Sequence, residues 1–326
     1  MFPENRPRRT RRTENLRNLV SETSILREKL IMPVFVDENI KEPKEIQSMP
    51  GIFSYPLSEL DSYARHLKNI GIRNVLLFGI PESKDGEGSQ AYDENGIVQK
   101  AIPYFRKNDL LVITDLCMCE YTDHGHCGIV VNGDVDNDAT ISYYGKIAVS
   151  QASAGADMIA PSGMMDGQVA EIRRSLDQAG FNHIPVMAYS AKYASSLYGP
   201  FRDAAQSTPS FGNRKTYQMD PANVREAMRE IEEDILEGAD LIMVKPALFY
   251  LDVVREARQR FDLPLVSYGV SGEYSLIMNG IRQKLIAESA IDEYLTSIFR
   301  AGADMVITYF AQYLCERTQD GKNNPE

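Results

Sequence analysis

The chain has 326 residues, of which 43% are hydrophobic and 25% are charged, as in an ordinary soluble globular protein. Its formal net charge of −11 argues against nucleic-acid binding over the body of the protein, and no apolar run reaches membrane-spanning length. The length suits two average domains or one large α/β barrel with insertions.

The N-terminal segment reverses this charge balance. Arginine occupies five of the seven positions from 6 to 12, with Pro3 and Pro7 beside them. Such a run suits a nucleic-acid arm, a targeting peptide or a strap on a partner subunit. The acidic remainder of the chain favours the strap, because a basic arm is attracted to an acidic neighbour. We interpret residues 1–28 as an arm for subunit contacts and residues 29–326 as the domain that carries the chemistry.

Eight short apolar runs are candidates for parallel strands. They begin near residues 31, 74, 110, 157, 184, 240, 264 and 304. Three of them follow the phrase Gly-Ala-Asp, at Gly155, Gly238 and Gly302, where the glycine ends a helix-like stretch. This alternation predicts an α/β fold, a (β/α)8 TIM barrel extended by the N-terminal arm. A doubly wound sheet is the alternative, but no Gly-x-Gly-x-x-Gly turn follows an early strand.

In such barrels the chemistry lies at the carboxyl ends of the strands. Several reactive or polar side chains lie at or just after these ends, namely Asp115, Ser162, Lys192, Lys245, Ser271 and Tyr309. We therefore expect one site at the barrel mouth.

Three of the four cysteines cluster after the third predicted strand. Cys117, Cys119 and Cys127 share one segment with His124 and His126. A soft-ligand cluster of this density is typical of zinc, and three thiolates leave a coordination position open for catalysis. Inert or redox-active cysteines are the alternative. No secretory signal precedes the cluster, so we expect reduced thiols and a cytoplasmic location.

Two lysines lie at the ends of neighbouring predicted strands. Lys245 closes the run Leu-Ile-Met-Val-Lys, and Lys192 follows the run that ends at Tyr189. Adjacent strands are about 4.8 Å apart, so both amines fit one pocket. Burial and a second ammonium lower a lysine pKa and release a neutral amine that forms Schiff bases with ketones or aldehydes. The alternative is structural pairing with a strand-end carboxylate.

The segment 190–220 is rich in small, polar and aromatic residues. It includes Arg202, Arg214 and Lys215, cations suited to a substrate carboxylate. A long segment over a barrel mouth is a candidate lid, with a solvated surface loop as the alternative.

Long phrases of the chain resemble the porphobilinogen synthase (5-aminolaevulinate dehydratase) family. They begin at Cys117 (Cys-Met-Cys-Glu-Tyr-Thr-Asp-His-Gly-His-Cys-Gly), Ser190 (Ser-Ala-Lys-Tyr-Ala-Ser-Ser-Leu-Tyr-Gly-Pro-Phe-Arg-Asp-Ala) and Met243 (Met-Val-Lys-Pro-Ala-Leu-Phe-Tyr-Leu-Asp). The resemblance covers nearly the whole chain and keeps the motifs in the family's order.

The resemblance implies the condensation of two 5-aminolaevulinate molecules to porphobilinogen with loss of two waters, a step of haem biosynthesis. It implies Schiff bases on two lysines, Lys245 for the first substrate and Lys192 for the second, aided by a catalytic zinc. The residues it implies are Ser271 and Tyr309 for the first carboxylate, Arg202, Arg214 and Gln218 for the second, Asp115 for proton transfer, and Cys117, Cys119 and Cys127 for zinc. With three thiolates as ligands, His124 and His126 are expected to support the zinc ligands from outside or to shape the loop.

The resemblance also implies an assembly and a second metal. Family members form homo-octamers in which the arm embraces a neighbouring barrel. Glu230 matches the position at which many bacterial members carry an allosteric, activating magnesium. The alternative for Glu230 is a solvated helix face, because Glu232 and Glu233 lie beside it.

Three positions depart from the family pattern, and two other functions compete with it. Gly269 stands where His or Gln is common, Gly163 where Asp is frequent and Glu120 where Pro is usual. We expect Gly269 to loosen the pocket floor. Another Schiff-base or zinc aldolase would need a phosphate-binding loop near the last strands, which we do not find. The acidic body and the lysine pair oppose a metal sensor or RNA-binding protein.

Overall fold

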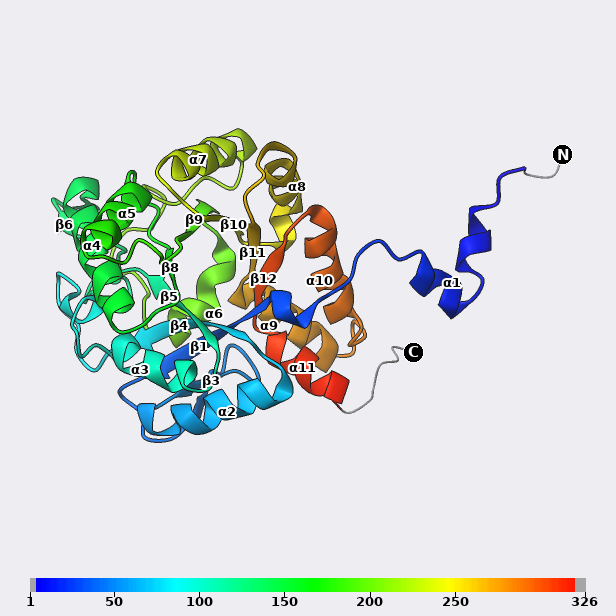
Figure 1. The fold of residues 1–326 in the computed structure, drawn as a ribbon, viewed down its shortest axis with the longest axis horizontal. Coiled ribbons are helices and arrows are strands. Elements are labelled where there is room, and N and C mark those ends of the chain that lie inside the picture. Colours follow the sequence, from blue (N-terminus) through cyan, green and yellow to red (C-terminus); the bar gives the residue numbers. More distant parts are fainter. Residues whose placement is uncertain (1–3, 320–326) are drawn as a thin grey trace.

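A ring of parallel strands forms the centre of the computed structural model, which describes residues 4–319 (Figure 1). The strands are β1 (Leu30–Asp37), β4 (Asn74–Ile80), β5 (Leu111–Leu116), β8 (Met158–Pro161), β9 (Met187–Lys192), β10 (Leu241–Lys245), β11 (Leu265–Gly269) and β12 (Met305–Thr308). They are hydrogen-bonded in the order β8-β5-β4-β1-β12-β11-β10-β9. A parallel bridge between Ile159 and Val186 joins the two ends. The TIM barrel is confirmed, and the ring excludes a doubly wound sheet.

The sequence pattern explains both strands and helix ends. Every residue of β1 is buried, as expected of a strand covered on both faces. Gly155, Gly238 and Gly302 have φ values of +102°, +103° and +129°, a backbone conformation that residues other than glycine rarely adopt. The repeated Gly-Ala-Asp phrase therefore marks the turn from a helix into the next strand.

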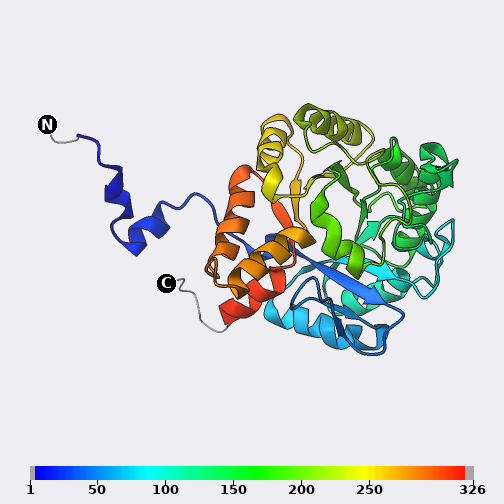
Figure 2. The same cartoon turned by 180° about the vertical axis from the view of Figure 1, so that it is seen from behind.

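Helices cover the outside of the ring in both views (Figures 1 and 2). They are α2 (Leu60–Ile70), α3 (Ile97–Arg106), α4 (Asn137–Ser153), α5 (Gln168–Gln178), α7 (Val224–Leu236), α8 (Leu251–Arg260), α9 (Ser271–Arg282), α10 (Ala290–Ala301) and α11 (Ala311–Gln319). In α2, the buried residues Leu60, Ala64 and Leu67 repeat at helical spacing, which places one apolar face on the strands.

Several short elements were not predicted. They are the hairpins β2 (Lys44–Glu45) with β3 (Phe53–Tyr55) and β6 (Val130–Val131) with β7 (Asp134–Val135), the helices α1 (Glu14–Leu19) and α6 (Gly199–Ala204), and the 3-10 turns η1 (Pro7–Arg11), η2 (Arg27–Lys29), η3 (Leu57–Glu59), η4 (Ser89–Ala91), η5 (Ser196–Tyr198) and η6 (Leu248–Tyr250). The fifth strand begins at Met187 rather than Ile184 and continues to Lys192. The polar residues Ser190 and Lys192 hid this extension, although their backbone continues the strand beside β10.

The N-terminal arm projects away from the barrel in both views (Figures 1 and 2). Neither η1 nor α1 contains a buried residue, and Leu19 is 80% exposed. Its role in subunit contacts stays a prediction. Residues 1–3 of the predicted arm and residues 320–326 of the predicted barrel domain lie outside the described residues. Within the described part, no helix is both long and apolar enough to cross a membrane.

Candidate active site

The two predicted lysines meet at the mouth of the barrel. Lys192 and Lys245 are the last residues of β9 and β10, and they are direct partners in the register of these parallel strands. Both side chains are buried, at 5% and 6% exposure. Parallel pairing therefore brings the two amines to the same side of the ring, as predicted.

Lys245 lies in an aromatic box. Its Nζ is 4.1 Å from the ring centre of Tyr268, 5.1 Å from Tyr189, 5.3 Å from Tyr198 and 5.4 Å from Phe201. Burial, with the neighbouring Lys192 as the next cause, lowers the pKa of Lys245 to about 7. A large fraction of this amine is therefore neutral and nucleophilic near pH 7.

Lys192 and Asp115 form the next group in the mouth. Lys192 Nζ donates to the carbonyl oxygen of Ser162, and Ser162 Oγ donates to Asp115 Oδ2 at 3.0 Å. Burial, followed by the charge of Glu120, raises the pKa of Asp115 to about 7, against the opposing effect of the two lysines. A carboxyl group with this pKa both gives and takes protons near neutral pH.

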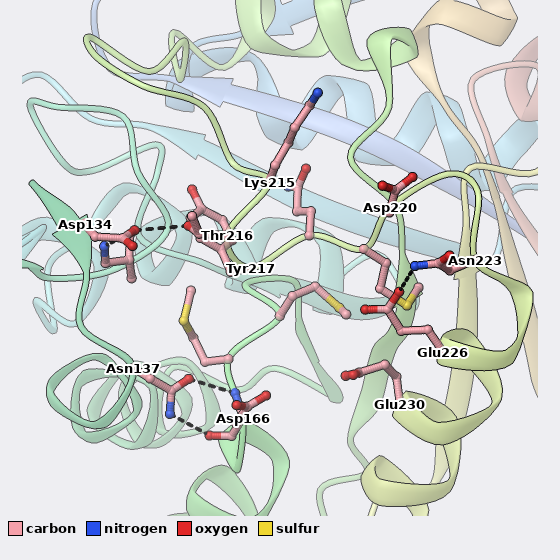
Figure 3. A pocket seen from close by; sticks show the side chains of 15 residues that line it. Asp134, Asn137, Asp166, Lys215, Thr216, Tyr217, Asp220, Asn223, Glu226 and Glu230 are labelled. Atoms are coloured by element: carbon pink, nitrogen blue, oxygen red, sulfur yellow. Dashed lines mark hydrogen bonds between the residues drawn. The ribbon is translucent and has the colours of Figure 1, made fainter.

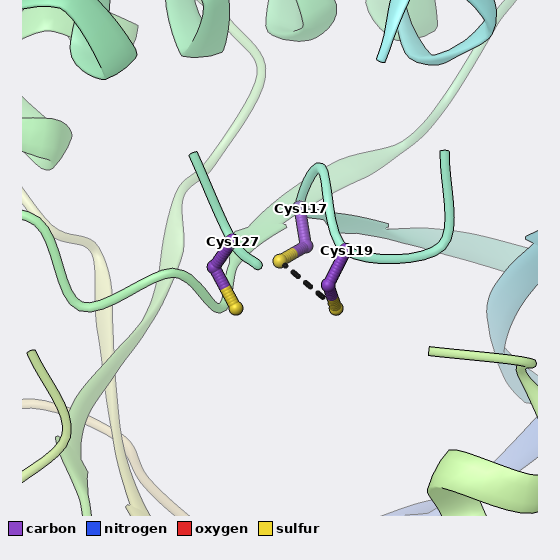
Figure 4. A group of neighbouring side chains, drawn as sticks. All are labelled: Cys117, Cys119 and Cys127. Carbon is purple, nitrogen blue, oxygen red and sulfur yellow. Dashed lines mark hydrogen bonds between the residues drawn. The ribbon is translucent and has the colours of Figure 1, made fainter. Parts of the chain in front are cut away.

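The three cysteines converge in the loop that follows β5 (Figure 4). Their sulfur atoms lie within 4.8 Å of one another, Cys117 Sγ and Cys119 Sγ are 3.5 Å apart, and all three residues are buried. Tetrahedral zinc with Zn–S bonds of about 2.3 Å sets sulfur atoms about 3.8 Å apart, so the cluster fits zinc. Burial raises the pKa of Cys117, and the thiols of Cys117 and Cys127 raise that of Cys119. A bound cation would offset the charge of the three thiolates.

The two histidines of this loop hold it in shape. The His126 ring lies 3.1 Å from Tyr217 Oη through Nδ1 and 3.0 Å from the Phe211 carbonyl oxygen through Nε2. His124 Nδ1 accepts a hydrogen bond from the His126 backbone N–H at 3.1 Å. These contacts agree with a loop-shaping role and tie the cysteine loop to the segment 190–220.

The segment 190–220 covers the mouth and contains α6. The backbone N–H of Phe201 in α6 donates to Ser271 Oγ at 3.0 Å. Arg214 Nη2 donates to the carbonyl oxygens of Ser207 at 2.6 Å and Gly125 at 2.9 Å. Arg214 is only 5% exposed, so this part of the segment is folded onto the barrel rather than solvated.

A small cavity remains beneath this cover. Its lining includes both lysines, Asp115, Cys119, Glu120, Arg202 and Arg214. Its volume is about 10 Å³, enough for about one water molecule. The buried Nε atoms of Arg202 and Arg214 have no hydrogen-bond partner among the described residues. Buried donors without partners are costly, so these guanidinium groups suit an anionic ligand.

Three predicted substrate-binding residues lie outside the lining of this cavity. Ser271 Oγ accepts a hydrogen bond from the Phe201 backbone N–H in α6. Tyr309 Oη lies 3.3 Å from the hydroxyl of Tyr268, and the ring of Tyr268 contacts Lys245. Gln218 is 3% exposed, and both of its amide atoms have no partner within the described part of the chain. Gln218 instead lines an acidic pocket on the other side of the segment 190–220.

Glu230 lies in a second pocket of about 390 Å³, on the face of α7 (Figure 3). Four further carboxylates line it, those of Asp134, Asp166, Asp220 and Glu226. Burial, followed by the charges of Asp166 and Glu226, raises the pKa of Glu230. The pocket therefore has an excess of negative charge, which favours a cation.

This arrangement agrees with the results of comparison with known proteins. A family model described as delta-aminolevulinic acid dehydratase matches residues 4–317. The chain belongs to this dehydratase family. The resemblance drawn from its motifs is confirmed.

Relatives of the dehydratase family match almost end to end. The Archaeoglobus fulgidus dehydratase is 54% identical over 98% of this chain and 99% of its own length. The Staphylococcus aureus dehydratase is 51% identical over 95% of this chain and 97% of its own. The Toxoplasma gondii enzyme, solved in complex with the reaction product porphobilinogen, has a TM-score of 0.95 and 40% identity over 99% of this chain and 95% of that one.

Two departures from the dehydratase pattern have a steric explanation. A Cβ atom on Gly163 would lie 1.7 Å from Tyr144 Oη, which donates to the Cys127 carbonyl oxygen at 2.6 Å. A Cβ atom on Gly269 would lie 2.3 Å from Tyr294 Oη. The expectation that Gly269 loosens the pocket floor is wrong with respect to packing, because Tyr294 fills that space.

Reasoning from the sequence missed part of the site. The aromatic box of Lys245 comes from β9, β11, η5 and α6, whose tyrosines and phenylalanine read as ordinary core residues. Glu120 was noted only as a departure, yet Cys119 Sγ donates to its Oε2 at 3.3 Å and it lines the cavity. The available signal for it was an acidic residue directly after Cys119, within the cysteine cluster.

Proposed function

We propose that the chain condenses two 5-aminolaevulinate molecules to porphobilinogen with loss of two waters, in haem biosynthesis in the cytoplasm. The observation that carries this proposal is the buried pair Lys192 and Lys245, register partners at the end of β9 and β10. Family membership and the Toxoplasma gondii product complex support the same chemistry.

Lys245 is the proposed nucleophile toward the first substrate. Its neutral amine attacks the ketone carbon, the carbonyl oxygen leaves as water, and an imine remains. The lowered pKa of Lys245 supplies the neutral amine. Ser271 and Tyr309 bind the carboxylate of this substrate once α6 moves off Ser271, because the Phe201 N–H now occupies the serine hydroxyl.

The second substrate is proposed to lie on the side of Lys192. Arg202, Arg214 and Gln218 bind its carboxylate, and their unpartnered buried donors supply the hydrogen bonds. Lys192 forms the second Schiff base with its ketone. Asp115 transfers protons in the same space, as its pKa of about 7 allows.

Zinc is the proposed catalytic metal, held by Cys117, Cys119 and Cys127. The buried sulfur cluster fits it, and Cys119 also lines the lysine cavity. Bound zinc would supply Lewis-acid polarisation of the second substrate. Tyr144 steadies the Cys127 backbone through its hydroxyl, which keeps the third ligand in place.

Magnesium is proposed at Glu230 as an allosteric activator. Magnesium keeps several waters and is commonly bound through only one or two carboxylates, which suits a roomy acidic pocket. Lys215, Thr216, Tyr217 and Gln218 of the cover also line this pocket, so a cation there would act on the segment that closes the site. Magnesium should raise activity in the wild type, and Glu230→Gln should abolish that response. Equal activation of both proteins would contradict the proposal.

The decisive experiment is incubation with 5-aminolaevulinate, zinc and a thiol reductant, with colorimetric detection of the pyrrole. The wild type should form porphobilinogen, and Lys245→Ala should lose activity by on the order of a thousandfold or more, as loss of a nucleophile does. Lys100→Ala is the matched control, because Lys100 is an exposed lysine paired with Glu38 outside the site. Absence of pyrrole from the wild type would overturn the proposed function.

A further inference from the structure

Glu273 is a fully buried carboxylate outside the lysine cavity. It is 0% exposed, and four donors hold it. Oε1 accepts from the backbone N–H groups of Ala247 at 2.9 Å and Leu248 at 2.8 Å, and Oε2 accepts from that of Val270 at 3.2 Å and from the Tyr294 hydroxyl. Burying a charge is costly unless hydrogen bonds compensate it, so this arrangement has a structural purpose.

The backbone donors come from the two strand ends that carry the first-substrate site. Pro246 has no N–H group, so Ala247 and Leu248 offer the first two backbone donors after Lys245. Val270 precedes Ser271 and is the N-cap of α9. The register between β10 and β11 ends at the pair Val244 and Ser267. Glu273 therefore connects the segments that follow β10 and β11, just beyond the last paired residues of the two strands.

Tyr294 completes this connection in a way that depends on Gly269. The tyrosine hydroxyl occupies the space that a side chain on residue 269 would fill, since a Cβ there would lie 2.3 Å from Tyr294 Oη. Gly269 does not have a positive φ, so its backbone conformation does not require glycine. The glycine therefore makes room for the hydroxyl that bonds to Glu273.

We propose that Glu273, supported by Tyr294, is a positioning residue that fixes the Lys245 amine relative to the Ser271 hydroxyl. This inference rests on the proposed function, in which these two groups bind the ketone and the carboxylate of the same substrate. One carboxylate that bridges both backbones sets their separation, and a nucleophile must be placed within a fraction of an ångström to react efficiently. Glu273 itself does not line the lysine cavity.

Glu273 acts through geometry rather than charge. The largest influences on the pKa of Lys245 are burial and the charge of Lys192, which lower it, and the charges of Asp115, Glu120 and Cys119, which raise it. Burial raises the pKa of Glu273 to about 7. Its role therefore predicts a change in substrate binding and turnover without a change in the protonation midpoint of Lys245.

The test uses Glu273→Gln and Tyr294→Phe in the full chain. The glutamine keeps the volume, but in either orientation its amide NH₂ opposes a backbone N–H, that of Val270 or those of Ala247 and Leu248. We expect KM for 5-aminolaevulinate to rise about tenfold or more in Glu273→Gln and about threefold in Tyr294→Phe, by loss of one hydrogen bond or more. The pH midpoint for borohydride trapping of substrate on Lys245 should stay at its wild-type value in both.

Glu237→Gln is the matched control. Glu237 Oε2 accepts from two backbone N–H groups, those of Val169 and Ala170 at 3.1 Å, away from the site. It should lower thermal stability without raising KM. Gly269→Ala should displace the Tyr294 hydroxyl and raise KM as Tyr294→Phe does.

Three results would overturn the inference. They are unchanged KM and kcat in a folded Glu273→Gln, a shift of its trapping midpoint by about one pH unit, and an equal rise of KM in Glu237→Gln. If Glu273→Gln does not fold, the same measurements of KM, kcat and trapping midpoint are made on Tyr294→Phe and Gly269→Ala. Unchanged KM and kcat in both would then overturn the inference. A wild type that makes pyrrole while these variants match it would refute this inference alone, whereas a wild type without pyrrole would refute the proposed function.

Discussion

Lys245 shows at the scale of a single residue how the fold produces reactivity. Its position at a strand end was predictable, because a charge closed an apolar run. Its box of three tyrosines and Phe201 was not, because these residues come from four separate elements. The sequence could therefore predict the nucleophile, but only the packing reveals how strongly burial lowers its pKa.

The first prediction concerns the pH dependence of Lys245. The amine reacts in its neutral form, so imine trapping should increase as pH rises through about 7, the lowered pKa of Lys245. Lys192→Met removes the second cause of the shift and should move this midpoint upward, but not to the ordinary value of 10.5, because burial remains the larger cause. Borohydride trapping across a pH series measures it. A midpoint that stays in place or falls would contradict the assigned cause.

The second prediction concerns the cysteine cluster. Cys119→Ala removes one of three sulfur ligands, and zinc affinity should fall by more than the roughly 10–100-fold typical of an outer-shell loss. Equilibrium titration with a zinc indicator measures this without any activity assay. Cys315→Ala is the control, because Cys315 is also buried but lies in α11, outside the cluster. Equal zinc affinity in both variants would refute the site.

At the scale of elements, the barrel was largely predictable and its cover was only partly so. The Gly-Ala-Asp phrase and the continuous apolar runs marked strand starts within about three residues. The segment 190–220 contains neither the Gly-Ala-Asp phrase nor a long apolar run. Only its composition suggested a lid. Its helix α6 is six residues long and is held by tertiary contacts such as that between Phe201 and Ser271, which local sequence does not encode.

The third prediction concerns the motion of this cover. The cavity of about 10 Å³ is too small for two substrates, so we expect the part of the segment 190–220 that follows β9 to open when they enter. Hydrogen exchange of this segment should slow when porphobilinogen is bound, while exchange in α2, which lines neither pocket, should not change. Equal exchange of the segment with and without saturating product would contradict a mobile lid.

At the scale of the whole molecule, the N-terminal arm stands out because its elements η1 and α1 bury no residue against the barrel. Its helix α1 buries no residue, and Leu16, Leu19 and Val20 are exposed beside a run of arginines. The sequence predicted a basic arm from composition alone. What it binds could not follow from the sequence, because a basic composition suits several kinds of acidic partner.

The fourth prediction is that the arm builds the assembly. Light scattering of the full chain should give a mass several-fold above the 36.6 kDa protomer, consistent with the proposed octamer. Deletion of residues 1–28 should give a smaller species with an intact barrel, visible as unchanged helical circular dichroism per residue. An unchanged assembly after deletion would refute the role of the arm.

The most direct test of the central claim is the site of covalent attachment. Reaction of the wild type with 5-aminolaevulinate and borohydride, followed by peptide mass spectrometry, should place substrate on Lys245, with the label absent in Lys245→Ala. Lys192 should also be labelled, because the proposal assigns it the second Schiff base. A wild type that turns over substrate with no adduct on Lys245 would contradict the account.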